Sequence, residues 1–454
     1  MPINISKIEH RRFTGTTSAT ANGTGAVKPV IPKDYTGAVR NKVYGLNGIG
    51  TYVYGDDVER DGVNFPVAGV AGPAVNPAYL KGCRLTDNLF VYAYDDGADG
   101  NDGKCFAVST SGDTPTVGSA SEFEDGGCTD VAITRLSDST FAVAYIDSGD
   151  TYLKAVIGTV SGTTITYGDI KSTDIAATAT MAAAGVDICE PRPGLLFIAF
   201  QVASGTDGST VCIPYTETDV LGTVTGQVEF DQAAPTNISC CSYYPGYAVV
   251  VYTDAGDSNK VHAWACTVSA SGVVAFGTEK TLVDAAGTLC QVSSPEPLNI
   301  VVSYLDASSD AALIATTISA ASTPVVATGG SVITPFGAGT HTGVRHSMID
   351  NTQGIIVGDD GTYMKAIRFS KAAKVLTADA VIDTAVEARC ATEIEAVCNR
   401  VGDVCIAYTN ASDVIYVVVG SYLENRVIDI RSSSASTAYS FDLVPVFGSE
   451  PSFT

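Results

Sequence analysis

The stretch Phe141-Ala-Val-Ala-Tyr145-Ile-Asp147-Ser-Gly149 decides the fold, because copies of it recur along the chain. Each copy joins an apolar run to an anchor position, and most add an aspartate two residues later. The other copies are Phe90–Gly97, Leu196–Phe200, Ala248–Gly256, Ile300–Asp306, Ile355–Gly361 and Cys405–Asn410. The anchors stand at positions 94, 145, 200, 252, 304, 358 and 408, at intervals of 51, 55, 52, 52, 54 and 50. Seven copies at this spacing indicate an internal repeat.

The residues around each anchor predict four strands. In the clearest copy, the apolar segment Asp130–Arg135 precedes the anchor strand, and Thr151–Val160 follows it after a short turn. Ser161-Gly162-Thr163 then leads into a short strand, Thr164–Gly168. These turns favour antiparallel strands joined by hairpins, and the continuous apolar runs are typical of strands buried on both faces. We therefore predict an all-β, seven-bladed β-propeller of four-stranded antiparallel blades, with a repeat of about 52 residues over residues 79–430.

The composition agrees with a strand-rich globular protein. The 454 residues are 45% hydrophobic and 17% charged, and they include 45 glycines. No apolar run reaches the roughly 18 residues of a membrane span. The first ten residues lack the apolar core of a secretory signal, so we expect synthesis in the cytoplasm without export through such a signal. The net charge of −23 argues against nucleic acid and anionic membranes as partners.

The basic charge is concentrated at the N-terminus. Residues 1–45 hold seven basic side chains against two acidic ones, a charge of +5 that leaves −28 on the remainder. The basic residues are Lys7, Arg11, Arg12, Lys28, Lys33, Arg40 and Lys42. We predict that this segment is an extended arm that docks onto a neighbouring protein, with a disordered leader as the alternative.

The termini also have to complete the propeller. We expect residues 46–78 to hold a closing strand and lead-in, with Gly50–Tyr54 pairing with the last blade, and residues 431–454 to form a tail. Closure by Ala438–Phe447 is the alternative.

Part of the repeat resembles a family. Gly158-Thr-Val-Ser-Gly-Thr163 and the following Ile165-Thr-Tyr-Gly168 resemble divergent propellers in structural and receptor-binding proteins of tailed bacteriophages. The single tryptophan, Trp264, excludes the repeated Trp-Asp pairs of WD40 propellers, and the Gly-Gly pairs of kelch repeats are missing. The resemblance implies a virion component that contacts other virion proteins, neighbouring copies of itself, or a glycan or protein on the host surface.

Few residues are candidates for metal binding or catalysis. Asp95, Asp96, Asp99 and Asp102 crowd a glycine-rich loop and are weak candidates for Ca²⁺, the alternative being a solvated hairpin tip. The aspartates that follow the anchors (Asp96, Asp147, Asp254, Asp306 and Asp360) are expected to cap turns. His10, His262, His341 and His346 accompany no nucleophile motif. The twelve cysteines contain no CxxC pair, which argues against a zinc cluster. We expect buried free thiols, and the alternative is disulfides that form in an oxidising environment.

These observations name no enzyme and no cofactor. We predict a non-enzymatic structural or adhesion component of a bacteriophage particle (tail, collar or capsid decoration) that presents loops for protein or host-surface contact. The alternatives are a carbohydrate-active propeller hydrolase and an extracellular ligand-binding propeller. The hydrolase requires carboxylates and arginines that converge on the channel.

Overall fold

The computed structural model describes residues 46–47, 51–52, 62–64, 69–112, 114–150, 152–172, 181–202, 207–216, 220–231, 234–359, 364–378, 393–400, 402–410, 412–423, 426–432 and 439–445. The chain divides into two compact units. The larger one is Asn64–Ser421, and the smaller one combines Met1–Val63 with Tyr422–Thr454. In the smaller unit, β1 (Leu46–Asn47) pairs with β2 (Thr51–Tyr52), and β33 (Arg426–Ser432) pairs with β34 (Tyr439–Pro445).

The larger unit consists of antiparallel sheets built from consecutive strands. The first sheet has β5 (Pro77–Thr86), β6 (Leu89–Asp96), β7 (Asp102–Ser111), β8 (Thr114–Val117) and β9 (Ser121–Glu124). The second has β10 (Cys128–Arg135), β11 (Thr140–Asp147), β12 (Leu153–Ser161), β13 (Thr164–Tyr167) and β14 (Lys171–Ser172). The third has β15 (Met181–Arg192), β16 (Leu195–Val202), β17 (Gly208–Pro214) and β18 (Val228–Asp231).

The remaining sheets continue this order. A seven-stranded sheet holds β19 (Pro235–Tyr244), β20 (Tyr247–Asp254), β21 (Lys260–Val268), β22 (Val274–Phe276), β23 (Lys280–Ser293), β24 (Asn299–Asp306) and β25 (Ala311–Thr317). The next has β26 (Gly343–Met348), β27 (Gln353–Asp359), β28 (Met364–Ala372) and β29 (Val375–Ala378). The last has β30 (Ile394–Cys398), β31 (Asp403–Thr409) and β32 (Val414–Leu423), joined by β3 (Gly62–Asn64) and β4 (Val70–Val75).

The described residues confirm the predicted all-β class. Their one helical element is the three-residue turn η1 (Ala255–Asp257), so no helix there has the length and apolarity to cross a bilayer. The anchors lie in β6, β11, β16, β20, β24, β27 and β31, each the second strand of its repeat copy. All eight residues of β11 are buried, as a strand covered on both faces requires.

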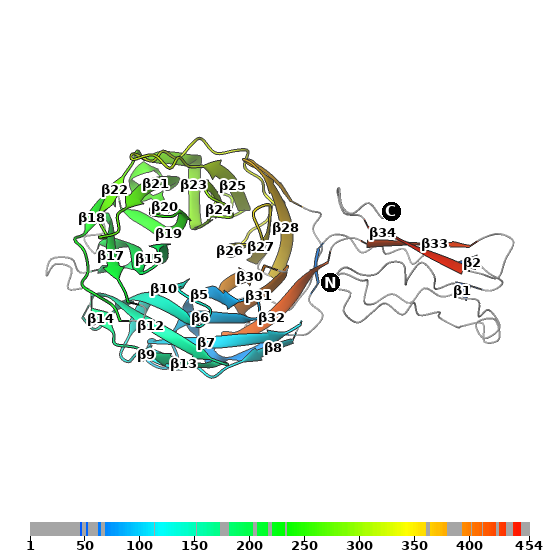
Figure 1. Cartoon of the computed structure of the whole chain (residues 1–454), viewed down its shortest axis with the longest axis horizontal. Coiled ribbons are helices and arrows are strands. Elements are labelled where there is room, and N and C mark those ends of the chain that lie inside the picture. Colours follow the sequence, from blue (N-terminus) through cyan, green and yellow to red (C-terminus); the bar gives the residue numbers. More distant parts are fainter. Residues whose placement is uncertain are drawn as a thin grey trace. The chain divides into compact units, whose positions relative to one another are not determined.

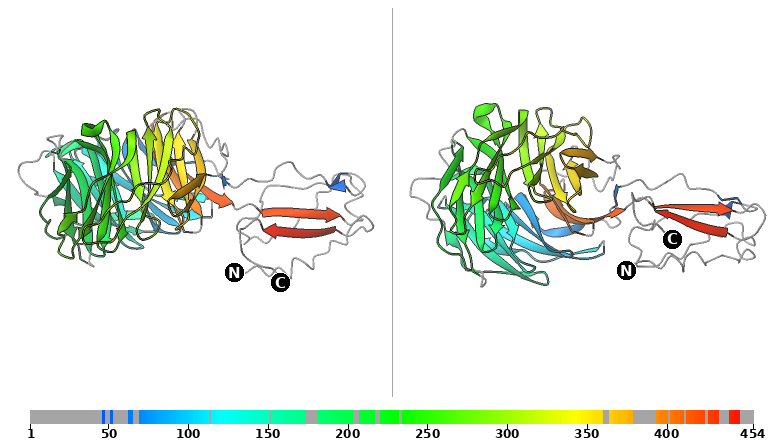
Figure 2. Two further views of the ribbon diagram at one scale, coloured as in Figure 1. Left: turned by 90° about the horizontal axis from the view of Figure 1, so that it is seen from above. Right: turned by 45° about the horizontal axis from the view of Figure 1, so that its top comes forward.

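The apolar cores lie between successive sheets. One core joins Val91 and Cys105 of the first sheet to Val143 and Val156 of the second. Another joins Tyr92 and Phe106 of the first sheet to Cys405 and Val417 of the last, although the two pairs lie near opposite ends of the described sequence. The first and last sheets therefore pack against each other. Within the larger unit, the sheets surround a common centre (Figure 1), and further views show the same arrangement (Figure 2).

The strand that joins the last sheet is not the predicted one. β4 pairs with β32, with Val70 opposite Val417 and Ala71 opposite Tyr416. The predicted closing stretch, Gly50–Tyr54, instead contributes β2, which pairs with β1. The alternative stretch near the C-terminus contributes β34, which pairs with β33. β4 lies within residues 46–78, where a closing strand is expected, but the choice of Gly50–Tyr54 was wrong. These segments have similar strand-forming sequences, and propensity does not identify a strand's partner.

Five of the described inner strands share a β-bulge. Each of them shifts register at an equivalent place, and a residue there has a positive φ angle. These residues are Tyr79 (φ 54°), Asp130 (55°), Gly185 (132°), Asn237 (51°) and Leu289 (53°). A left-handed backbone is uncommon for a tyrosine or a leucine, so the repeated bulge imposes it against local preference.

Candidate functional site

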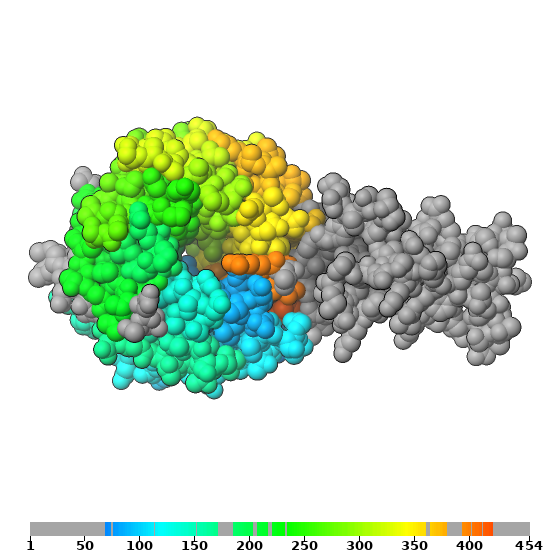
Figure 3. Space-filling view, in the orientation of Figure 1, coloured from blue at the N-terminus to red at the C-terminus, as the bar shows by residue number. Residues whose placement is uncertain are grey.

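The innermost strands and their ends carry a set of buried or half-buried polar side chains. We call these residues the inner-strand polar set: Lys81, Asp130, Asp187, Ser239, Gln291, Arg345, Ser347, Glu393 and Glu395. Several stand thirteen residues before an anchor, as Lys81 does before Tyr94 and Glu395 before Tyr408. Strands β5, β10, β15, β19, β26 and β30 lie nearest the centre in Figure 1. The space-filling view shows the larger unit hollowed at this centre (Figure 3).

Most members of the set accept hydrogen bonds from the backbone of the next inner strand. Asp130 Oδ2 accepts from the amides of Gly185 and Val186 on β15. Asp187 Oδ2 accepts from the Cys240 amide at 2.7 Å and from the Ser239 hydroxyl at 2.9 Å. These bonds tie each inner strand to its neighbour.

The same arrangement continues through the later sheets. Ser239 Oγ accepts from the Val292 amide at 3.1 Å, and Gln291 Oε1 accepts from the His346 amide at 2.8 Å. Ser347 Oγ accepts from the Cys398 amide at 2.8 Å. Side chains therefore join β19 to β23, β23 to β26, and β26 to β30.

Two further bonds connect the first sheet to its neighbours. Glu393 Oε2 accepts from the Leu80 amide of β5 at 3.1 Å, which links the last sheet to the first. Arg135 Nε of β10 donates to the Leu85 carbonyl of β5 at 2.9 Å. The links thus run from sheet to sheet and return to their start.

The charged members of the set act on one another electrostatically. The Lys81 ammonium favours the ionised forms of Asp130, Asp187 and Glu395, which belong to three other sheets. Burial still dominates: it raises the pKa of Asp130 to about 6 and that of Glu395 to about 7. Arg345 Nε donates to Glu395 Oε2 at 3.2 Å. Carboxyl groups with such pKa values beside an arginine have the composition of an acid–base site.

A buried histidine beside this set is neutral. His346 Nε2 lies 2.7 Å from Ser293 Oγ, and Nδ1 lies 2.8 Å from Ser303 Oγ. Burial, and then Arg345, lower the pKa of His346 to about 3. Two hydroxyl groups therefore hold an uncharged imidazole. His341 is buried too, and its Nδ1 bonds to the Asp359 carbonyl.

The four calcium candidates do not come together. Asp96, Asp99 and Asp102 converge on Lys104 Nζ, at 3.1, 2.5 and 3.9 Å. Asp95 precedes Asp96 in β6, so its side chain points to the opposite face of the sheet. Burial raises the pKa of Asp95 to about 6. The three converging carboxylates thus already share an ammonium, and calcium binding there stays a prediction.

A similar cluster occupies the next sheet. Lys154 Nζ bonds to Asp147 and lies 3.5 Å from Glu124 Oε2 and 3.3 Å from Asp150 Oδ2. The anchor Tyr145 donates its hydroxyl to Glu124 at 2.6 Å. Lys104 and Lys154 both lie directly across the hairpin from the anchor of their sheet.

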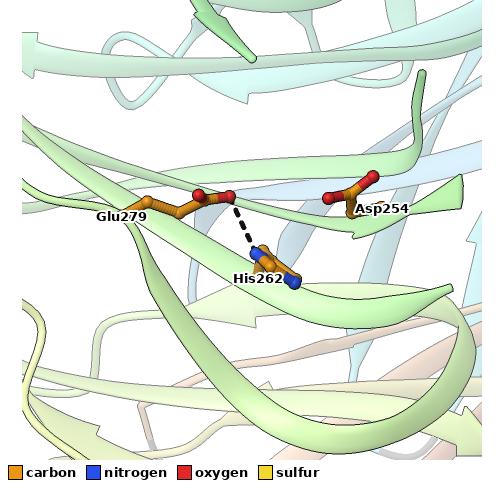
Figure 4. Close-up of side chains that lie close together, drawn as sticks. All are labelled: Asp254, His262 and Glu279. Atoms are coloured by element: carbon orange, nitrogen blue, oxygen red, sulfur yellow. Dashed lines mark hydrogen bonds and ion pairs between the residues drawn. The ribbon is translucent and has the colours of Figure 1, made fainter. Parts of the chain in front are cut away.

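A third cluster has histidine in the place of lysine. His262 lies opposite the anchor Tyr252, and its Nδ1 is 2.7 Å from Glu279 Oε1 while Nε2 is 3.2 Å from Asp257 Oδ2. Asp254 is near the same ring (Figure 4). We call the groups around Lys104, Lys154 and His262 the three cation clusters.

The aspartates after the anchors cap turns, as predicted. Asp147 Oδ1 accepts from the Gly149 amide at 2.6 Å, and Asp254 Oδ1 accepts from the Gly256 amide at 2.7 Å. Asp96 and Asp306 accept similar bonds from amides two residues on. Asp360, His10 and the arm residues Lys7, Arg11, Arg12, Lys28, Lys33, Arg40 and Lys42 lie outside the described residues.

The described cysteines are free thiols, as the sequence favoured. Most are buried, and burial raises their pKa, for Cys105 to about 12. They therefore stay protonated near neutral pH and pack as small apolar groups.

The inner-strand polar set was not predicted from the sequence, although the sequence contains a pattern that marks it. A charged or amide side chain stands thirteen residues before five of the anchors, at Lys81, Asp187, Gln291, Arg345 and Glu395. The chemical variety of these residues conceals the constant spacing.

Comparison with known proteins shows the fold. The sequence matches no family model and no curated protein sequence. The BP39L lectin from Burkholderia pseudomallei is similar in structure, with a TM-score of 0.54 at 14% identity over 82% of this chain and 99% of the lectin. The β-propeller domain of the Trilobed protease from Pyrococcus furiosus gives a TM-score of 0.39 at 10% identity, over 76% of this chain and 96% of that domain. The chain has a β-propeller fold.

Proposed function

We propose that this chain is a seven-bladed propeller that serves as a non-enzymatic binding module. The blade count takes the seven-stranded sheet as two blades that share β23. Residues 280–286 of this strand lie beside β21, and residues 287–293 pair with β24. Each of the repeat copies then supplies one blade, and β4 completes the blade that contains β32.

One observation carries the proposal of a binding role. The inner-strand carboxyl groups, whose pKa values burial raises, are bonded to the backbone or side chains of the neighbouring sheets. A general acid or base must exchange its proton with a bound substrate. A carboxylate oxygen that accepts from buried amides is poorly placed to do so, and losing those bonds would cost stability.

We propose further that the ligand is a protein or glycan on a surface and that the chain belongs to a bacteriophage particle. The resemblance of Gly158–Thr163 to phage propellers supports this placement. The division of the chain supports it as well, because both chain ends contribute to a unit distinct from the propeller. That unit would attach the propeller to a neighbouring virion protein.

A glycan array combined with hydrolysis assays tests the binding role. We expect the purified chain to bind a restricted set of glycans or a host-surface protein and to leave the bound glycans intact. Turnover of a polysaccharide that Glu395→Gln abolishes, in a variant that remains folded, would contradict the proposal.

The attachment role has a separate test. A chain that lacks residues 1–40 should keep a folded propeller, because the larger unit begins at Asn64. It should no longer enter the assembly. Normal incorporation of this truncated chain would contradict the attachment role and leave the binding role standing.

A propeller hydrolase is the second candidate. The observation in its favour is the pair Arg345–Glu395, in which burial gives a carboxyl group a pKa of about 7. Glu395→Gln and Asp187→Asn, assayed side by side, discriminate the two functions. A hydrolase loses turnover in at least one of them at unchanged fold, whereas a binding module keeps its ligand affinity in both.

A further inference from the structure

The three cation clusters share a plan, and the third departs from it in one residue. Lys104, Lys154 and His262 each face the anchor tyrosine of their sheet and lie among acidic side chains. An ammonium group has three donors and no lone pair, whereas a neutral imidazole offers a nitrogen lone pair to a metal ion. With histidine in place of lysine, the side chains of the cluster can therefore coordinate a metal ion.

The side chains around His262 have the spacing of a metal site. Asp254, His262 and Glu279 each offer a ligand atom, and these atoms all lie within 4.8 Å of one another (Figure 4). A small movement of the side chains brings all three to the roughly 2 Å at which Zn²⁺ binds nitrogen and oxygen ligands. Asp254 and His262 are buried, while the Glu279 side chain is 35% exposed. An ion could thus enter on the Glu279 side and keep water there.

Neighbouring groups hold these three side chains in place. The Gly256 amide fixes Asp254, and the Tyr252 hydroxyl donates to Glu279 Oε1 at 2.5 Å. Trp264 Nε1 in turn donates to the Tyr252 hydroxyl at 3.1 Å. Hydrogen bonds of this kind orient metal ligands and increase affinity.

The charges around the cluster leave a place for a cation. Lys260 Nζ lies 3.1 Å from Asp257 and 2.9 Å from Asp284, so this ammonium is paired with those carboxylates. Among the described residues, neither Asp254 nor Glu279 forms an ion pair with a lysine or arginine. Asp257 also lies 3.2 Å from His262 Nε2. The second ring nitrogen thus has a carboxylate partner while Nδ1 faces Glu279.

We propose that Asp254, His262 and Glu279 bind a divalent transition-metal ion such as Zn²⁺, with Asp257 holding the ring from behind. The ion ties the end of β20 to β21 and to the segment that precedes β23. It takes the place that the ammonium groups of Lys104 and Lys154 occupy in the first two sheets. The site is independent of the binding role proposed above.

Titration of the chelator-treated, full-length protein with Zn²⁺ by calorimetry tests this proposal. We expect one ion per chain, and an affinity at least roughly tenfold weaker in Glu279→Gln. His262→Lys rebuilds the plan of the other two clusters, so it should stay folded and bind no ion. Glu122→Gln is the matched control, because Glu122 belongs to an acidic group with Asp99 and Asp102 that contains no histidine.

A second measurement uses Co²⁺ in place of Zn²⁺ and records the visible absorption spectrum. The spectrum distinguishes binding at this site from binding by cysteine thiols. Co²⁺ bound by imidazole and carboxylates shows visible absorption without a strong thiolate charge-transfer band. That spectrum, lost in His262→Lys, supports the site. Absence of binding to the wild type, binding that His262→Lys retains, a thiolate band, or loss of binding in Glu122→Gln would each overturn it.

Discussion

The inner-strand polar set and the three cation clusters use similar residues in opposite ways. In the first, carboxylates and hydroxyls bond to the backbone of a neighbouring sheet, as Asp187 does to Cys240. In the second, carboxylates meet a cation near the hairpin that follows an anchor, as Asp99 does at Lys104. Asp187 is half-buried, and the Asp99 side chain is 66% exposed.

The two groups of residues differ in how freely they can change without disturbing the fold. A buried carboxylate that bonds to amides in another sheet cannot change without loosening the junction between two sheets. A carboxylate in a local cluster can accept another cation without disturbing that junction. Binding chemistry can therefore vary among the clusters, as His262 illustrates, while the inner strands keep the ring together.

Tyr145→Ala should have the largest effect, because this residue joins the second cation cluster to the apolar core. Its ring is fully buried in the core, and its hydroxyl bonds to Glu124 in the second cluster. We expect a loss of about 3–5 kcal/mol in unfolding free energy, measured by urea denaturation. Tyr145→Phe removes the hydroxyl alone and should cost about 1 kcal/mol. Equal losses in the two variants would show that the cluster, and not the core, holds this strand.

The pH dependence of stability should reveal Glu395. Burial raises its pKa from 4.5 to about 7, so between these values the folded chain binds a proton that the unfolded chain has released. Its stabilising contribution is complete below pH 4.5 and is lost as the pH rises toward 7. Glu395→Gln should flatten the stability curve in this window by about 3 kcal/mol. Denaturation at a series of pH values checks this, and parallel curves would contradict the buried position of Glu395.

Asp187→Ala should destabilise by about 2 kcal/mol, because the Cys240 amide and the Ser239 hydroxyl lose their acceptor in a buried place. Chemical denaturation gives the value. A loss below that of an exposed substitution would place Asp187 outside the structural set.

Asp99→Asn should have the smallest effect, below about 1 kcal/mol, since the Asp99 side chain is solvent-exposed and two other carboxylates remain near the Lys104 ammonium. Thermal denaturation in low and high salt checks this. A larger loss that salt does not reduce would show that the clusters, too, maintain the fold.

The fold could be predicted from the sequence because the repeat is periodic, and the spacing of apolar residues indicates local secondary structure. The apolar runs around Tyr145 and Tyr252 led correctly to the all-β class and the propeller. Closure at Gly50–Tyr54 failed, because β4 competes for the same edge and no local signal distinguishes the two. The bulges at Tyr79 and Leu289 could not be predicted either, since neither residue type favours a positive φ.

The sites were harder to predict than the fold for a physical reason. The carboxylate partners of Lys154 and His262 come from strands or turns on either side, so spacing alone does not bring them together. The loop Asp95–Asp102 is a calcium candidate by its composition, yet no motif indicates that Lys104 reaches three of its carboxylates. Two of the three cation clusters had no sequence motif at all.

Inner-strand side chains join each sheet to the next. A double-mutant cycle between Asp187 and Ser239, on β15 and β19, tests this linkage at a single hydrogen bond. Urea denaturation of Asp187→Ala, Ser239→Ala and the double variant should give a coupling energy of about 1–2 kcal/mol. Strictly additive losses, with no coupling between the two positions, would contradict it.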